Sequence, residues 1–177
     1  MKSQFARVLG TVSSVLVFIS LLGACAPRPW FVFKPADGSF VASFPIEPTK
    51  TIKTMITAAG PTDVTFYNAV EKQMVYTVTV SDYTTEQIQG AGQDKFLDSA
   101  RDGAVANIHG TLLDETRADV RGHPGRDIKI KAAGGKGTFR CKLILVGDRL
   151  FQLIVANPSD AADSSDVKRF LDSFSLK

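Results

Sequence analysis

Most of this chain consists of short segments in which apolar and polar residues alternate, with turn residues between them. Phe40, Ala42 and Phe44 begin the pattern, and Leu143–Val146 is apolar at every position. Alternation with a period of two indicates a strand with one buried face, and a continuous apolar run indicates burial on both faces. The pattern predicts strands at 40–44, 51–57, 64–70, 74–80, 111–120, 126–132, 136–146 and 150–156, with a turn at Gly122-His123-Pro124-Gly125 among others.

Two segments have the period of an amphipathic helix instead. The first is 93–108, although Gly103 lowers its helix propensity by up to about 1 kcal/mol relative to Ala. The second follows Asp163-Ser164-Ser165, which can cap its start, and its apolar residues are Val167, Phe170, Leu171 and Phe174. We therefore predict an α+β fold: a single domain with a mostly antiparallel sheet flanked by helices.

The N-terminal segment has the character of an export signal. Lys2 and Arg7 are the only charges among residues 1–24, and the apolar stretch of about 15 residues is shorter than the ~20 of a spanning helix. The segment ends in Leu22-Gly23-Ala24-Cys25, which resembles the bacterial lipobox. This resemblance implies that diacylglycerol is attached to Cys25 and that the signal is cleaved before it. The alternatives are an ordinary secretory signal and an uncleaved anchor.

The predicted organisation is a lipoprotein signal peptide at 1–24, a lipidated N-terminus and short tether at 25–36, and a globular domain at 37–177. Pro27 and Pro29 favour an extended tether. Trp30, Phe31 and Phe33 begin a first strand or dip into the membrane interface. Without the signal, 19 Lys and Arg face 18 Asp and Glu, a net charge of about +1. We therefore expect no nucleic-acid partner.

Motifs that would bring catalytic or metal-binding groups together do not occur in the sequence. There is no GxSxG, HExxH, Walker loop, CxxC or EF-hand loop. His109 and His123 are interpreted as solvated residues, with a metal or catalytic role as the alternative. Asp114 and Glu115 are neighbours on a strand and point to opposite faces, so they should not share a proton. We expect no enzymatic activity, no cofactor and no metal.

Cys141 is the one thiol that remains once Cys25 carries lipid, so no internal disulfide is expected. Cys141 alternates with apolar residues on one strand face, which predicts a buried thiol. The glycines of Gly134-Gly135-Lys136-Gly137 could cradle a phosphate, but no helix follows them. A hairpin connection is therefore favoured there.

A stripe of cations is predicted on two adjacent strands. Lys129, Lys131, Arg140 and Lys142 alternate with apolar residues, which places them together on one surface. This surface is a possible interaction site for anionic lipid headgroups or a partner. The alternative is an ordinary solvated strand face that discourages edge pairing.

Four segments of the chain together resemble the PsbP-like family of bacterial and photosynthetic-organelle domains. They are Phe40-Val41-Ala42-Ser43-Phe44-Pro45, Gly122-His123-Pro124-Gly125-Arg126-Asp127, Val146-Gly147-Asp148-Arg149-Leu150-Phe151-Gln152-Leu153 and Phe170-Leu171-Asp172-Ser173-Phe174. The resemblance implies an α/β/α sandwich used as a non-catalytic binding or assembly module. It implies no ligand and no functional residue.

The functional expectation is a non-enzymatic lipoprotein of the bacterial cell envelope that faces the periplasm and binds or helps to assemble another envelope protein. Ala26 is not the Asp that signals inner-membrane retention in enteric bacteria, which favours the outer membrane. One alternative is a small-ligand-binding protein or enzyme with a site near the Gly122–Arg126 turn. Another is a purely structural envelope protein.

Overall fold

The computed structural model describes residues 29–135, 137–158 and 163–177. The predicted signal segment and Cys25 lie outside these residues, as do Lys136 and 159–162.

Seven strands form one antiparallel sheet in the order β3-β4-β5-β9-β8-β7-β6. Pairing between β5 and β9 joins the group β3-β4-β5 to the group β9-β8-β7-β6. This long-range contact places β5, β9 and β8 in the interior of the sheet. The strands are β3 (Thr49–Thr57), β4 (Gly60–Glu71), β5 (Met74–Asp82), β6 (Thr111–Val120), β7 (His123–Lys131), β8 (Thr138–Val146) and β9 (Arg149–Asn157).

The turn between β6 and β7 is shorter than the sequence pattern predicts. Only Arg121 and Gly122 form it, with φ of 55° and 82°, two positive values typical of a type I′ hairpin turn. The predicted turn residues His123 and Pro124 belong to β7 instead. Gly125 is also in the strand. A glycine is needed there because a Cβ would collide with the backbone carbonyl of Leu143 in β8.

Three short strands form a second antiparallel sheet in the order β1-β2-β10. They are β1 (Phe31–Phe33), β2 (Phe40–Phe44) and β10 (Ser175–Leu176). Because β1 pairs with β2, the domain starts within the range 25–36 that the sequence assigns to the tether, and the predicted boundary at residue 37 is too late. Phe31–Phe33 thus form a strand, the first of the two alternatives.

Trp30 packs onto the domain immediately before β1. Its ring lies edge-on to that of Tyr76, with 5.7 Å between ring centroids, and the Arg169 guanidinium lies 4.6 Å from the Trp30 ring centroid. This cation–π contact joins the start of the domain to its last helix.

Within the described residues, three α-helices accompany the sheets: α1 (Thr85–Ala91), α2 (Gln93–Asn107) and α3 (Ser165–Asp172). The predicted helix at 93–108 corresponds to α2, and the predicted cap of α3 is confirmed, since the Val167 N–H donates to Ser164 Oγ at 3.4 Å. Helix α1 was not predicted. A capping box starts it, in which Thr84 and Gln87 satisfy each other's backbone N–H groups. A 3-10 turn, η1 (Ala133–Gly135), connects β7 to β8.

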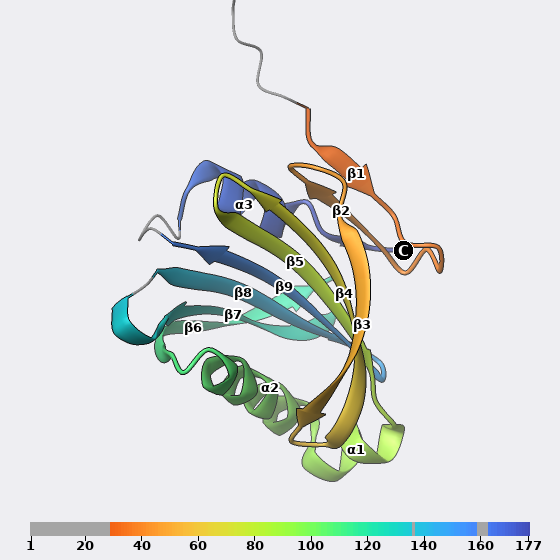
Figure 1. Cartoon of the computed structure of the whole chain (residues 1–177). Helices are drawn as coiled ribbons and strands as arrows, with labels where there is room; N and C mark the ends of the chain where they lie inside the picture. Colours follow the sequence, from red (N-terminus) through yellow and green to blue (C-terminus); the bar gives the residue numbers. More distant parts are fainter. Residues whose placement is uncertain (1–28, 136, 159–162) are drawn as a thin grey trace, which may run out of the picture.

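The layers form the expected α/β/α sandwich. Figure 1 shows α3 and the small sheet on one face of the large sheet, and α1 and α2 on the other. Strand β8 is buried on both faces, as predicted: Ile144 packs toward α3, and Leu143 and Leu145 pack toward α2.

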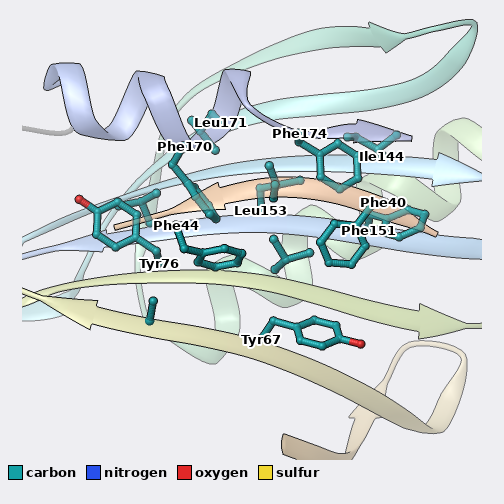
Figure 2. Packing of buried hydrophobic residues seen from close by; sticks show 14 of the residues in the cluster. Phe40, Phe44, Tyr67, Tyr76, Ile144, Phe151, Leu153, Phe170, Leu171 and Phe174 are labelled. Carbon is teal, nitrogen blue, oxygen red and sulfur yellow. The ribbon is translucent and has the colours of Figure 1, made fainter. Parts of the chain in front are cut away.

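The core on the α3 side is rich in aromatic rings (Figure 2). Phe40, Phe44 and Phe170 are fully buried there. Phe40 lies edge-on to Phe151, with 5.9 Å between ring centroids. This core and the one under α2 are built from residues within 30–176, and all strand pairs lie in the same range. Residues 26–177 therefore contain every helix, strand and core cluster that the structure describes.

Replacing Phe170 by Ala should lower the free energy of unfolding by about 3–5 kcal/mol, because its ring fills the space between Phe44 and Tyr76, at centroid distances of 5.2 and 5.4 Å. Urea unfolding of residues 26–177 measures this. The exposed Lys168→Ala on the same helix is the control and should change stability by about 0.5 kcal/mol or less. A loss below about 1 kcal/mol for Phe170→Ala would remove α3 from the core.

Candidate functional site

A cavity of about 800 Å³ lies between α2 and the large sheet. It exists because α2 packs against β7 and β8, so that the helix only partly covers the same face of β3, β4, β5 and β9 and leaves a space above it. Its volume falls within the ~300–1,000 Å³ typical of small-molecule sites. The cavity is the candidate functional site.

The floor of the cavity is formed by alternate residues of the central strands. Thr79 of β5 lies at its centre, since it pairs with Phe66 of β4 on one side and with Gln152 of β9 on the other. Ser81 and Ile154 extend the same face. The opposite residues of these strands fill the aromatic core, as the period of two requires.

The roof of the cavity is the inner face of α2, which carries small residues at its middle. Ala100, Gly103 and Ala104 line the cavity between the larger Phe96 and Ile108. A Cβ at Gly103 would meet nothing within 4 Å. The space therefore persists because the helix presents few side-chain atoms to fill it.

One end of the cavity is closed by a polar contact between α1 and the hairpin of β3 and β4. The Gln87 side chain donates to the Ala59 carbonyl at 2.9 Å and accepts from the Thr84 N–H at 2.7 Å. Tyr83 lies edge-on to Phe96 beside it, with 4.8 Å between ring centroids. Burial raises the pKa of Tyr83, so the phenol stays neutral at physiological pH.

The floor contains two buried hydroxyls, those of Thr79 and Ser81, that make no hydrogen bond within the described residues. Thr79 is 2% exposed, and its Oγ1 makes no hydrogen bond within the described residues. Thr77, on the same face of β5, differs: its hydroxyl donates to Asn68 Oδ1 at 2.7 Å. Leaving a buried hydroxyl unpaired costs about 1–3 kcal/mol. Thr79 is thus a polar group that a molecule in the cavity could satisfy.

Helix α2 is held in its off-centre position by a buried arginine on β7. Arg126 is 4% exposed, and its Nη2 lies 2.9 Å from Asp94 Oδ1 and 3.1 Å from Asp98 Oδ1. Its Nε lies 3.1 Å from Glu115 Oε1, and Glu115 also pairs with Arg101 of α2 at 2.7 Å. The hydrogen bond from Arg126 holds the pKa of Asp94 below its ordinary value. These ion pairs fix α2 to the β6–β7 side of the sheet.

The carboxylate pair Asp114 and Glu115 behaves only partly as predicted. The two side chains do face apart, since Asp114 pairs in register with Lys129 and Glu115 with Ile128. Asp114 is exposed, but Glu115 is half-buried in the Arg126 network and is not the solvent-facing charge that the sequence indicates. Sequence alone does not place α2 above Glu115.

The predicted cation stripe lies on the α3 face of β7 and β8, with Lys129 directly opposite Arg140. Both are paired with Asp163, at 2.9 and 3.1 Å, and Arg140 also pairs with Asp127 at 2.7 Å. Lys142 Nζ lies 3.9 Å from Asp172, and Lys131 is half-buried beside them. The surface is therefore one of mixed charge, and its role in binding stays a prediction.

The two histidines lie at opposite ends of β6, about ten residues apart along the strand, or ~30 Å. They cannot bind one metal together. Among the described residues no group of three His, Cys, Asp or Glu side chains is placed to hold a metal ion. Cys141 is buried, as predicted, and burial raises the pKa of its thiol to about 12.

One alternative from the sequence was a ligand site near the Gly122–Arg126 turn. This turn does not line the cavity. Pro124 instead borders a second, more open hollow of about 540 Å³ at the start of α2, beside Asp94 and Arg117. The large cavity was not predicted. Its sequence signals are the small residues at 100, 103 and 104 and the polar residues at 79 and 81, and neither set identifies a cavity without the position of α2.

The chain matches no protein-family model and no curated protein. Among solved structures it is similar to the solution structure of cyanobacterial PsbP (CyanoP) from Synechocystis sp. PCC 6803, with a TM-score of 0.57 and 13% sequence identity over 96% of this chain and 99% of that chain. A protein of unknown function from Pseudomonas aeruginosa, PA94, gives a TM-score of 0.39 and 10% identity over 77% and 88%. The similarity to CyanoP confirms the PsbP-like α+β fold.

No helix in the described part of the chain has the length and apolar character needed to cross a bilayer.

Replacing Arg126 by Met should lower the free energy of unfolding by about 2–3 kcal/mol. The value lies below the ~3–5 kcal/mol of fully buried ion pairs because Asp94 and Asp98 keep contact with water. Urea unfolding measures it. Arg117→Met is the matched control: Arg117 is 77% exposed and pairs only with Asp94, so its loss should cost about 0.5 kcal/mol or less.

The difference in the free energy of unfolding between Arg126→Met and the unaltered domain should depend on pH. The folded-state pKa of Asp94 is lowered, so ionised Asp94 stabilises the folded domain. This stabilisation is complete above the ordinary aspartate pKa of 3.8 and is lost as the pH falls from 3.8 through the lowered folded-state pKa. Equal destabilisation at pH 7 and at pH 2.5 would contradict a role for ionised Asp94.

Proposed function

We propose that this chain is a lipid-anchored, non-catalytic binding protein of a bacterial cell envelope, and that the cavity under α2 is its binding site. The single observation that carries the proposal is a small-molecule-sized cavity, floored by an unpaired hydroxyl, in a fold whose other face is filled by aromatic side chains. The lipobox-like segment ending in Cys25 supports the anchor. The PsbP-like fold supports an accessory role alongside another envelope component.

The lining of the cavity supports binding rather than catalysis. Its polar groups among the described residues are hydroxyls and amides, with Asp102 as the one charged side chain. Asp102 is exposed and pairs with Arg101 at 2.9 Å, so it is not placed as a general base inside the cavity. The Cys141 thiol, with its pKa of about 12, is not a nucleophile at physiological pH.

The proposed anchor joins the domain on the side away from the cavity. Trp30 is the fifth residue after Cys25, and five steps of ~3.6 Å span at most about 18 Å. Trp30 and β1 lie on the α3 side, whereas the cavity lies under α2 (Figure 1). A bilayer at Cys25 would therefore face the small sheet and leave the cavity directed toward the periplasm.

Replacing Cys25 by Ala should release the protein from membranes or leave it unprocessed at 177 residues, because the acyl acceptor is lost. Fractionation of cells followed by mass spectrometry of the intact protein measures both. Ala26→Ser, which keeps the cysteine, is the control and should stay lipidated. An unacylated, cleaved wild-type protein would contradict the anchor.

The binding role is tested with an uncharged fluorescent probe, N-phenyl-1-naphthylamine, on residues 26–177. We expect saturable 1:1 binding that Ala104→Phe weakens at least about tenfold, because the ring occupies the cavity from α2. Ala133→Phe makes the same change on the exposed η1 and should bind as the unaltered domain does. Equal binding by both variants, or none by the unaltered domain, would contradict the proposal.

A further inference from the structure

We infer that the ligand of the cavity is an uncharged amphiphile: an apolar chain that ends in one neutral hydrogen-bonding group. The inference rests on the proposed function and adds the chemical class of the ligand. Three properties of the cavity lead to it: its shape, its unpaired hydroxyl and its lack of charge.

The shape of the cavity fits an extended apolar chain. It follows α2 from Phe96 to Ile108, which at 1.5 Å per residue is about 18 Å. Along this length apolar side chains line both walls, with Phe66 and Ile154 on the sheet and Phe96 on the helix. An elongated, mostly apolar space between a helix and a sheet takes a chain more readily than a compact polar molecule, because most of the contacts along it are apolar.

The unpaired Thr79 hydroxyl lies midway along β5 in this space and requires a partner. The hydroxyls of Ser81 and Tyr83 and the amide of Gln152 line the cavity close to it. A ligand with a hydroxyl or ester carbonyl at this point would satisfy Thr79, and the Thr77 hydroxyl would not compete, since it is bonded to Asn68. A purely apolar ligand would leave Thr79 unpaired.

The charge of the lining determines the charge of the ligand. No Lys, Arg or His is among the described residues that line the cavity, so a carboxylate or phosphate head group would be buried without a counter-ion. A cationic head group would meet only Asp102, which is at the exposed edge and already paired. An uncharged head group is the remaining chemistry that fits.

A second copy of the chain or a peptide fits this space less well. β3 is an edge strand of the large sheet and lines the cavity at Met55–Thr57, so another chain could pair only at this rim, whereas the floor strands β4, β5 and β9 are paired on both sides. The volume is also that of a small ligand rather than of a protein interface.

The test compares two ligands with the same chain, 1-monomyristoylglycerol and myristate at pH 8, in displacing N-phenyl-1-naphthylamine from residues 26–177. Both are used below the concentration at which they form micelles. We expect the neutral monoglyceride to displace the probe at a concentration at least about tenfold lower than the anion. Equal displacement by both would overturn the inference and leave the binding role intact.

Thr79→Val tests the hydroxyl directly. It keeps the shape of the side chain, so the domain should unfold at the same or a higher urea concentration, while monoglyceride binding weakens about fivefold, the equivalent of one neutral hydrogen bond. Myristate binding should not change. Thr65→Val on β4, whose side chain points to the opposite face, is the matched control and should leave both ligands unaffected.

The outcomes separate the two proposals. Suppose that Ala104→Phe abolishes probe binding but Thr79→Val binds the monoglyceride with unaltered affinity. This result would overturn only the inference about the head group and would leave the binding role intact. Absence of probe binding, with a dimer of residues 26–177 in light scattering that Ala104→Phe converts to monomer, would overturn both and make this face an interface between copies.

Discussion

The position of α2 on the sheet is the constraint on which the rest of this structure depends. Arg126 reaches carboxylates on α2 and on β6 at once, because its planar guanidinium offers several donors in a fixed arrangement. That network holds the helix over β7 and β8. Had α2 packed over the central strands β5 and β9, its apolar face would have covered Thr79 and Gln152, and the cavity would not exist.

The two faces of the large sheet differ because aromatic side chains cover the face toward α3. On the α3 side, rings from β2, β5, β9 and α3 pack edge to face around the fully buried Phe40 and Phe170 (Figure 2). This packing gives the α3 side a continuous buried core of its own. The α2 side can therefore keep small residues and an unpaired hydroxyl, features that lower stability and are typical of binding sites.

Local pattern was enough to predict most strands, helix α3 and the burial of Cys141, because alternation and helical spacing record which side of an element is buried. It was not enough for the cavity. The cavity requires that β5 pair with β9, about seventy residues later, and that Arg126 bind α2, and neither contact leaves a periodic signal. Helix α1 was missed because it is short and buries only Ile88, so its Thr84–Gln87 capping box was the sole local sign.

The arrangement of the faces also limits how the proposed ligand could arrive. Trp30 is fixed to the domain by Tyr76 and Arg169, so a short anchor from Cys25 would give the domain little freedom to turn over. The cavity would then stay on the side away from the anchoring bilayer, and a chain-like ligand could not slide into it directly from those lipids. Such a ligand would have to be delivered by, or handed to, another component in the periplasm. The two proposals taken together thus describe an accessory protein that would receive an uncharged amphiphile on one face while a lipid on Cys25 holds the opposite face to a membrane.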